Sequence, residues 1–306
     1  MKSLIVVFSC DRAMQLEALL KSIVCYWKHP DYEINVLFRA SKEAFLRGYN
    51  KLRGVFHSVT FFQETALSGA CYSWPELTHF YNLKLLFFCP HLRGHKSDFR
   101  QQLLAILNRN KSDTVLFLTD DSIVFRPIEI RQENLLWLTE NPIQRQFSLR
   151  HGQELSNGRQ LSLTEDGYEW RFRDFGNQDH WGYRFSLDGH LYHRDTIASF
   201  LKRASFNNPN SLESSGFLHS CHKGIFTEGR CRKNVSLLSY PLNIVQSTFA
   251  NAHMDATPSV LNDYFLQGYS LQYPIPEKIS SFQVYPRHVV LVRKHDKIIF
   301  PIQLTK

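Results

Sequence analysis

The stretch TVLFLTDDSIVF, residues 114–125, decides the fold, because an apolar run from Val115 to Leu118 leads directly into two adjacent carboxylates, Asp120 and Asp121. A continuous apolar run of this kind is typical of a buried central strand in a parallel sheet. Open α/β sheets bind their ligands beyond the carboxyl ends of such strands. The stretch therefore predicts that both aspartates stand at the mouth of a cleft.

The two aspartates are expected to have different tasks. Successive side chains of a strand point to opposite faces, so Asp121 shares a face with Thr119 whereas Asp120 points the other way. We predict that a metal ion here is held by Asp121 and that Asp120 faces a sugar hydroxyl or a basic partner. The alternative is that the pair only forms a turn or caps a helix, since Asp is common in turns.

The first half of the chain alternates strand and helix patterns, as a mainly parallel sheet flanked by helices does. The predicted strands start at residues 4, 34, 59 and 114, and the predicted helices cover 12–27, 42–52 and 97–108. The fold class is therefore α/β. GxGxxG after a strand and GxxxxGK[ST] are both absent from the sequence, so phosphate groups need another means of binding.

From about Gln146 the pattern changes to short strands in a mixed or antiparallel arrangement, separated by polar turns. We divide the chain into residues 1–145 and 146–306, two halves of one domain with a C-terminal extension. The second half is predicted to contain strands in QFSLRHG, DGYEWRFRDF and FSLDGHLYH, a helix over 195–202, a loop in FNNPNSLES, a strand in LLSYPLNIV, a loop over 252–258 and a helix over 259–266.

Composition narrows the class of protein. The 306 residues are enough for one large domain, and the net charge of +8 favours an anionic partner such as a nucleotide, a nucleic acid or an acidic lipid surface. The apolar run at residues 4–8 is too short for a signal peptide, and no stretch is long enough to span a membrane, so we expect a cytoplasmic protein. The six cysteines form no CxxC pair and are predicted to be free thiols, with a zinc site at Cys221 and Cys231 as the alternative.

With strand-end motifs SCDR (9–12) and TDDS (119–122), and the segment DGHLYHRDTI (188–197), the chain resembles the GT-A family of nucleotide-sugar-dependent glycosyltransferases. The resemblance implies a GT-A-like sheet whose first half binds a nucleoside-diphosphate sugar and whose second half binds a carbohydrate or lipid-linked glycan acceptor. It also implies Mn²⁺ or Mg²⁺ at the position of the family's DxD motif. Thr119 departs from that motif, which leaves Asp121 as the expected metal ligand.

The resemblance assigns further donor-binding residues. Asp11 and Arg12 fall where similar enzymes contact the nucleobase and ribose, with a helix cap as the alternative. Lys96 and Arg100 are candidates for the phosphates, although Arg100 could equally lie along a surface helix. The implied second metal ligand is His253, one of 14 histidines.

The resemblance assigns the chemistry to the second half. Glu213 is the predicted general base, which makes the reaction inverting, and Asp188 is the second candidate. The alternatives are that Glu213 lies in the first turn of a helix and that Asp188 belongs to a DG turn. Aromatic residues of this half could stack on a sugar or fill the core, namely Trp170, Trp181, Tyr183 and Tyr192.

The basic stretch 219–233 is compatible with a phosphate-bearing acceptor and peripheral membrane contact, or with a solvated loop. Two other classes of protein stay open at this point. A noncatalytic module that binds nucleic acid or anionic glycan would also be basic and aromatic, although the resemblance favours an enzyme with no nucleic-acid partner. A sugar-phosphate nucleotidyltransferase would need a glycine-rich loop after the first strand, and SCDRAMQ contains no glycine.

Overall fold

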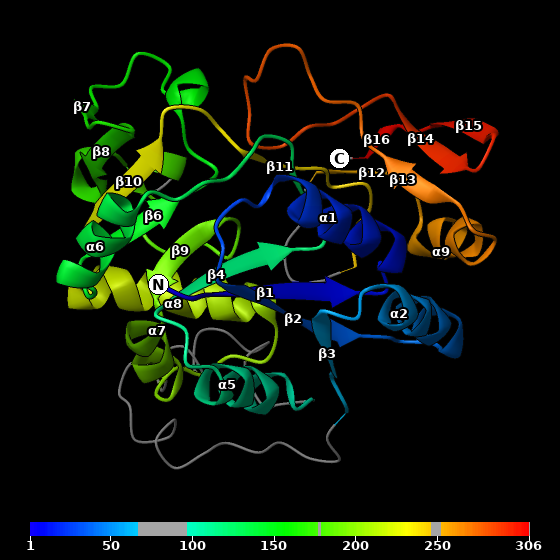
Figure 1. Ribbon diagram of the computed structural model, residues 1–306, viewed down its shortest axis with the longest axis horizontal. Helices are drawn as coiled ribbons and strands as arrows, with labels where there is room; N and C mark the ends of the chain where they lie inside the picture. The colour runs from blue at the N-terminus through cyan, green and yellow to red at the C-terminus, as the bar shows by residue number, and fades with distance from the viewer. Residues whose placement is uncertain (67–96, 177–178, 246–251, 306) are drawn as a thin grey trace.

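The computed structural model describes residues 1–66, 97–176, 179–245 and 252–305. Its centre is a nine-stranded sheet in the order β3-β2-β1-β4-β9-β6-β10-β8-β7 (Figure 1). The four strands from β3 to β4 are parallel, whereas β9 is antiparallel to both of its neighbours. The strands are β1 (Ser3–Cys10), β2 (Tyr32–Arg39), β3 (Val59–Gln63), β4 (Thr114–Thr119), β6 (Arg145–Ser148), β7 (Ser162–Leu163), β8 (Gly167–Arg171), β9 (His190–His193) and β10 (Glu228–Arg232).

Helices cover both faces of this sheet, which confirms the α/β prediction. In Figure 1, α1 lies above the sheet and α5 and α7 lie below it. Because side chains alternate along a strand, Ile5 and Val7 of β1 enter one apolar core while Leu4 and Val6 enter the other. The helices are α1 (Ala13–Tyr26), α2 (Glu43–Val55), α5 (Phe99–Arg109), α6 (Gln132–Glu140), α7 (Arg194–Leu201), α8 (Pro209–Lys223) and α9 (Pro258–Leu266).

Strand β4 behaves as its apolar run predicts. Leu116 and Leu118 pack in the core under α1, whereas Val115 and Phe117 pack on the opposite face. The strand ends at Thr119, and the chain continues into β5 (Ser122–Val124), which pairs with β11 (Leu237–Ser239). Two buried faces require an apolar residue at every position, which is why the run is continuous instead of alternating.

Several predicted elements of the second half differ from the structure. The predicted loop FNNPNSLES is instead the start of α8, whose first turn is capped by the Asn208 side chain accepting from the backbone N–H of Ser211 at 2.8 Å. Pro209 occupies the first helical position, where a missing N–H costs nothing. The stretch 219–233 is not one loop, since it contains the end of α8 and strand β10. Of LLSYPLNIV, only Leu237–Ser239 is a strand.

The C-terminal part contributes pairing that the sequence did not predict. The strands β13 (Ser270–Gln272), β14 (His288–Arg293) and β15 (Asp296–Pro301) form an antiparallel sheet beside α9 (Figure 1). A two-residue strand, β12 (His253–Met254), pairs with β16 (Leu304–Thr305), so the segment that carries His253 is fixed by the end of the chain. None of the helices in the described part of the chain has the length and apolar character needed to cross a bilayer.

Candidate active site

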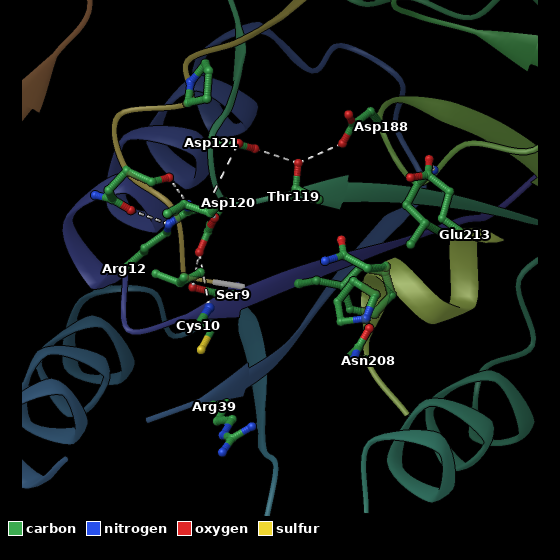
Figure 2. A pocket seen from close by; sticks show the side chains of 18 of the residues that line it. Ser9, Cys10, Arg12, Arg39, Thr119, Asp120, Asp121, Asp188, Asn208 and Glu213 are labelled. Atoms are coloured by element: carbon green, nitrogen blue, oxygen red, sulfur yellow. Dashed lines mark hydrogen bonds and ion pairs between the residues drawn. The ribbon is translucent and has the colours of Figure 1, made fainter. Parts of the chain in front are cut away.

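A pocket of about 380 Å³ opens at the carboxyl ends of β1, β2 and β4, where the fold predicts a ligand. Figure 2 shows Arg12 and Asp120 on one side of this pocket and Asp188 and Glu213 on the other. The pocket thus joins the two halves of the chain. The polar and charged residues among its lining are Ser9, Cys10, Arg12, Arg39, Glu64, Thr119, Asp120, Asp121, Asp188, Asn208, Asn210, Glu213, Asn243, His253 and Gln283.

Asp120 is buried and has a basic partner, as its face of the strand predicts. Its Oδ1 accepts from the Arg12 guanidinium at 2.9 Å, and its Oδ2 accepts from the Ser9 hydroxyl at 2.8 Å. Burial raises the pKa of Asp120 to about 6, while the Arg12 charge acts in the opposite direction. Arg12 also donates from Nε to the Asn243 side chain at 2.7 Å. This network therefore ties the ends of β1 and β4 to the segment after β11.

Asp121 and Asp188 are joined by one hydroxyl. The Thr119 Oγ1 lies 2.7 Å from Asp121 Oδ1 and 2.7 Å from Asp188 Oδ1 (Figure 2). A threonine hydroxyl has a single hydrogen, so it donates to one of the two carboxylates at a time. The other oxygen of Asp188 accepts from Arg150 at 2.7 Å, with the two side chains 25% and 9% exposed respectively. Asp188 is therefore held on both oxygens.

Glu213 lies in the first turns of α8 and lines the same pocket. Glu213 is helical, as the alternative predicts, but it follows the first turn instead of lying in it, and this position does not conflict with a role in the pocket. Its Oε1 accepts from the backbone N–H of Leu187 at 3.0 Å. Burial, followed by the negative charge of Asp188, raises the pKa of Glu213 to about 7. A carboxyl group with this pKa is suited to proton transfer near neutral pH.

His253 and Asp121, the two predicted metal ligands, both line this pocket. Within the ranges that the structure describes, no group of three or more His, Cys, Asp or Glu side chains could hold a metal ion by itself. One carboxylate and one imidazole suit Mn²⁺, with the remaining positions left to substrate oxygens and water. A metal ion at this pair of residues stays a prediction.

Two predicted donor-binding residues have other positions, and a third cannot be placed. Asp11 does not line the pocket, because its carboxylate accepts from the backbone N–H and hydroxyl of Ser41 at 2.7 and 2.6 Å. It is not a helix cap either, since the residue before α1 is Arg12. The phosphate role predicted for Arg100 is wrong: its buried guanidinium donates to backbone carbonyls at the end of α7 and beyond. Lys96 lies outside the described residues.

Most predicted acceptor-side aromatics are core residues. Trp170 and Trp181 belong to a small apolar cluster. Tyr192 is fully buried in the core on the face of the sheet that α5 and α7 cover. Tyr183 is different, because it is only partly buried and stacks on Phe217 of α8 with 4.4 Å between ring centroids. Within the described residues, Cys221 and Cys231 belong to no group of three or more side chains that could hold a zinc ion.

The sequence reasoning missed residues that the strand order brings to the pocket. Arg39 ends β2 and Glu64 follows β3, and both line the pocket (Figure 2 labels Arg39). Arg150 was missed because its partner Asp188 lies 38 residues away. The sequence could have indicated Arg39 and Glu64, because both lie at the carboxyl ends of predicted parallel strands, and such strand ends meet at one edge of the sheet.

Comparison with known proteins supports the resemblance found in the motifs. No family model matches the chain. The chain is 23% identical over 244 residues to the bifunctional glycosyltransferase pgtA of Dictyostelium discoideum, and the match covers 69% of this chain and 27% of that protein. This chain therefore spans only about a quarter of that relative.

Two solved glycosyltransferase structures resemble this chain only distantly. The structure of S. aureus TarS 1–349 with UDP has a TM-score of 0.44 at 14% identity, covering 78% of this chain and 59% of that one. The apo structure of the bifunctional enzyme WbbM has a TM-score of 0.34 at 15% identity, covering 71% and 37%. At these TM-scores the likenesses do not bear on activity. In sequence, this chain is similar to a glycosyltransferase.

Proposed function

We propose that this protein is a glycosyltransferase that moves a sugar from a nucleoside-diphosphate sugar to a hydroxyl of a carbohydrate or lipid-linked glycan. One observation carries the proposal: a single pocket at the strand ends brings together Asp121, Asp188, His253 and Glu213, whose pKa is raised to about 7. The similarity to the Dictyostelium glycosyltransferase supports the same reaction class.

In this proposal the donor lies along the strand ends. The nucleobase faces the end of the pocket that Arg39 and Glu64 line, with apolar contacts from Phe8, Leu37 and Phe99. The diphosphate lies near Asp121 and His253, and the sugar near Asp188. A pocket of about 380 Å³ falls within the usual range of roughly 300–1,000 Å³ for small-molecule sites.

Glu213 acts as the general base. Its carboxylate takes the proton of the acceptor hydroxyl while that oxygen forms a bond to the anomeric carbon of the donor. The bond from the anomeric carbon to the diphosphate oxygen breaks, and its electron pair leaves with the diphosphate. This single displacement inverts the anomeric centre. Asp188, held by Arg150 and Thr119, lies beside Glu213 and orients the sugar.

Asp121 and His253 would hold Mn²⁺ or Mg²⁺, which would neutralise charge on the leaving diphosphate when bound. The cytoplasmic location and peripheral membrane contact expected from the sequence belong to the same proposal.

The proposal is tested by the melting temperature of the protein with UDP, GDP, CDP, ADP and CMP, each with and without Mn²⁺. A ligand at 100 times its Kd that binds only the folded protein adds about 2.7 kcal/mol of stability. We expect one nucleoside diphosphate to stabilise the wild type in the presence of Mn²⁺ and to lose that effect in Asp121→Asn. An absence of stabilisation by every nucleotide would reject the proposal.

A further inference from the structure

A second, much smaller cavity of about 20 Å³ lies behind the Arg150–Asp188 pair. Its lining consists mostly of basic or aromatic side chains, namely Arg150, His151, His180, Tyr183, Ser186, His190 and Phe282. Three buried nitrogens of these residues have no hydrogen-bond partner within the part of the chain that the structure describes: Arg150 Nε, His151 Nε2 and His190 Nε2. The three residues are 7%, 2% and 2% exposed. Buried polar atoms normally have a partner.

The hydrogen-bond network fixes what His190 presents to this cavity. Its Nδ1 lies 3.0 Å from Gln146 Oε1, and the amide nitrogen of Gln146 donates to the carbonyl of Arg184 at 2.9 Å. Because Gln146 Oε1 can only accept, His190 Nδ1 carries the hydrogen. In the neutral ring, Nε2 is then an acceptor. Burial, then the charge of Arg150, lowers the pKa of His190 to about 3, so the ring stays neutral.

The other two nitrogens are donors. Arg150 Nε always carries a hydrogen. The Ser148 hydroxyl oxygen accepts from the backbone N–H groups of Arg150 and His151, each at 3.2 Å, so its own hydrogen points to His151 Nδ1 at 2.7 Å. His151 therefore carries its hydrogen on Nε2. Burial, followed by the charges nearby, lowers the pKa of His151 well below its ordinary value and keeps this ring neutral as well, although the backbone of His180 acts in the opposite direction.

The cavity thus offers two donors, Arg150 Nε and His151 Nε2, and one acceptor, His190 Nε2. A halide accepts hydrogen bonds but cannot donate one to His190, and a metal ion would be repelled by the two N–H groups. A water molecule accepts two hydrogen bonds and donates to the third site. About 20 Å³ exceeds the roughly 10–15 Å³ that one water requires.

From this pattern we infer that the cavity binds one ordered water joining Arg150, His151 and His190, and that Arg150 is thereby a positioning residue for Asp188. The Arg150 guanidinium is then fixed on three sides. It donates to Asp188 from Nη1 at 2.7 Å, lies over the Phe282 ring at 4.8 Å and donates to the water from Nε. Loss of the water's acceptor would release the guanidinium and, with it, the carboxylate that it holds in the pocket.

The water site is tested without any assay of activity. A crystal structure at about 1.5 Å resolution should show one water peak within hydrogen-bond distance of His190 Nε2 and Arg150 Nε. Nitrogen-15 NMR of the histidines should show His190 protonated on Nδ1 and neutral down to pH 5. A cavity without a peak, or His190 protonated on Nε2 or charged near pH 6, would overturn the inference.

The positioning role is tested with two substitutions of His190 and rests on the proposed function. His190→Phe removes the acceptor, whereas His190→Gln keeps an oxygen acceptor. We expect the Phe variant to lower kcat for nucleotide release from the donor about 10- to 100-fold with the donor KM unchanged, and the Gln variant to recover most of kcat. Equal losses in both folded variants, or no loss in the Phe variant, would reject the positioning role. If the wild type releases no nucleotide, the proposed function fails, and the crystal and NMR results still decide the water site.

Discussion

The substitution Glu213→Gln should stabilise the protein at alkaline pH. A carboxyl group whose pKa rises from 4.5 to about 7 on folding binds more protons in the native state between these pH values. The free energy of unfolding therefore falls as pH rises through this window, and the whole loss is present above pH 7. Below pH 4.5 the group is protonated in both states and contributes no difference.

The size of the effect follows from the same values. At about 1.36 kcal/mol per pKa unit, the largest loss is about 3 kcal/mol. Because the Glu213 side chain keeps part of its surface open to the pocket, solvent reduces this loss, and we expect about 1–2 kcal/mol. Glutamine has nearly the same shape, and its carbonyl can still accept from the Leu187 N–H, so the substitution removes the charge and leaves the packing.

The assay is urea unfolding of the wild type and Glu213→Gln at pH 4.5 and pH 8.5. The difference in free energy of unfolding between the two proteins should shift in favour of the variant by about 1–2 kcal/mol from the lower to the higher pH. Glu154→Gln is the matched control: although Glu154 is partly buried, its hydrogen bond from Arg126 lowers its pKa, so its contribution to stability changes mainly below pH 4.5 and its substitution should shift the difference only slightly, in the opposite direction. No shift for Glu213→Gln would show that its pKa is not raised and would remove the main argument for it as the base.

Four further substitutions test other residues. Asp121→Asn and His253→Ala should each weaken Mn²⁺ binding in the presence of nucleotide, measured by calorimetry, and unchanged affinity would reject either residue as a ligand. Arg12→Met leaves the buried carboxylate of Asp120 without its charged partner and should cost about 3–5 kcal/mol of stability in urea unfolding; a loss below 1 kcal/mol would contradict this. Arg100→Met should cost about 2–3 kcal/mol while leaving nucleotide affinity unchanged, because its guanidinium binds carbonyls near α7; weakened nucleotide binding would restore the phosphate role.

The sequence predicts best the strands whose side chains are buried on both faces of the sheet. The apolar runs of β1 and β4 are continuous because both faces of these strands are covered, and no other element produces that pattern with such flanking helices. Side-chain alternation was enough to place Asp120 and Asp121 on different faces, but not to choose a basic partner for Asp120 over a sugar hydroxyl. The partner, Arg12, lies 108 residues away and follows from strand order, which periodicity does not contain.

The misassigned residues share a physical cause. Asn and Ser next to Pro are equally typical of a loop and of a helix start, so FNNPNSLES could be assigned only once Asn208 was seen to cap α8. Arg100 was assigned to the phosphates because the resemblance implies a basic donor contact just before the helix that precedes the TDDS strand. Its carbonyl acceptors lie about 100 residues later, at the end of another helix. Long-range partners decide such roles, and single-sequence patterns do not record them.

The most direct test of the account is nucleotide release from a panel of nucleoside-diphosphate sugars with Mn²⁺, comparing the wild type with Glu213→Gln. The wild type should release the diphosphate from donors of one nucleobase and transfer the sugar to an acceptor hydroxyl. The variant should bind the same nucleotide but turn over about 10² to 10⁴ times more slowly. Release that is equal in both proteins would contradict the role of Glu213, and no release from any donor would contradict the proposed transferase itself.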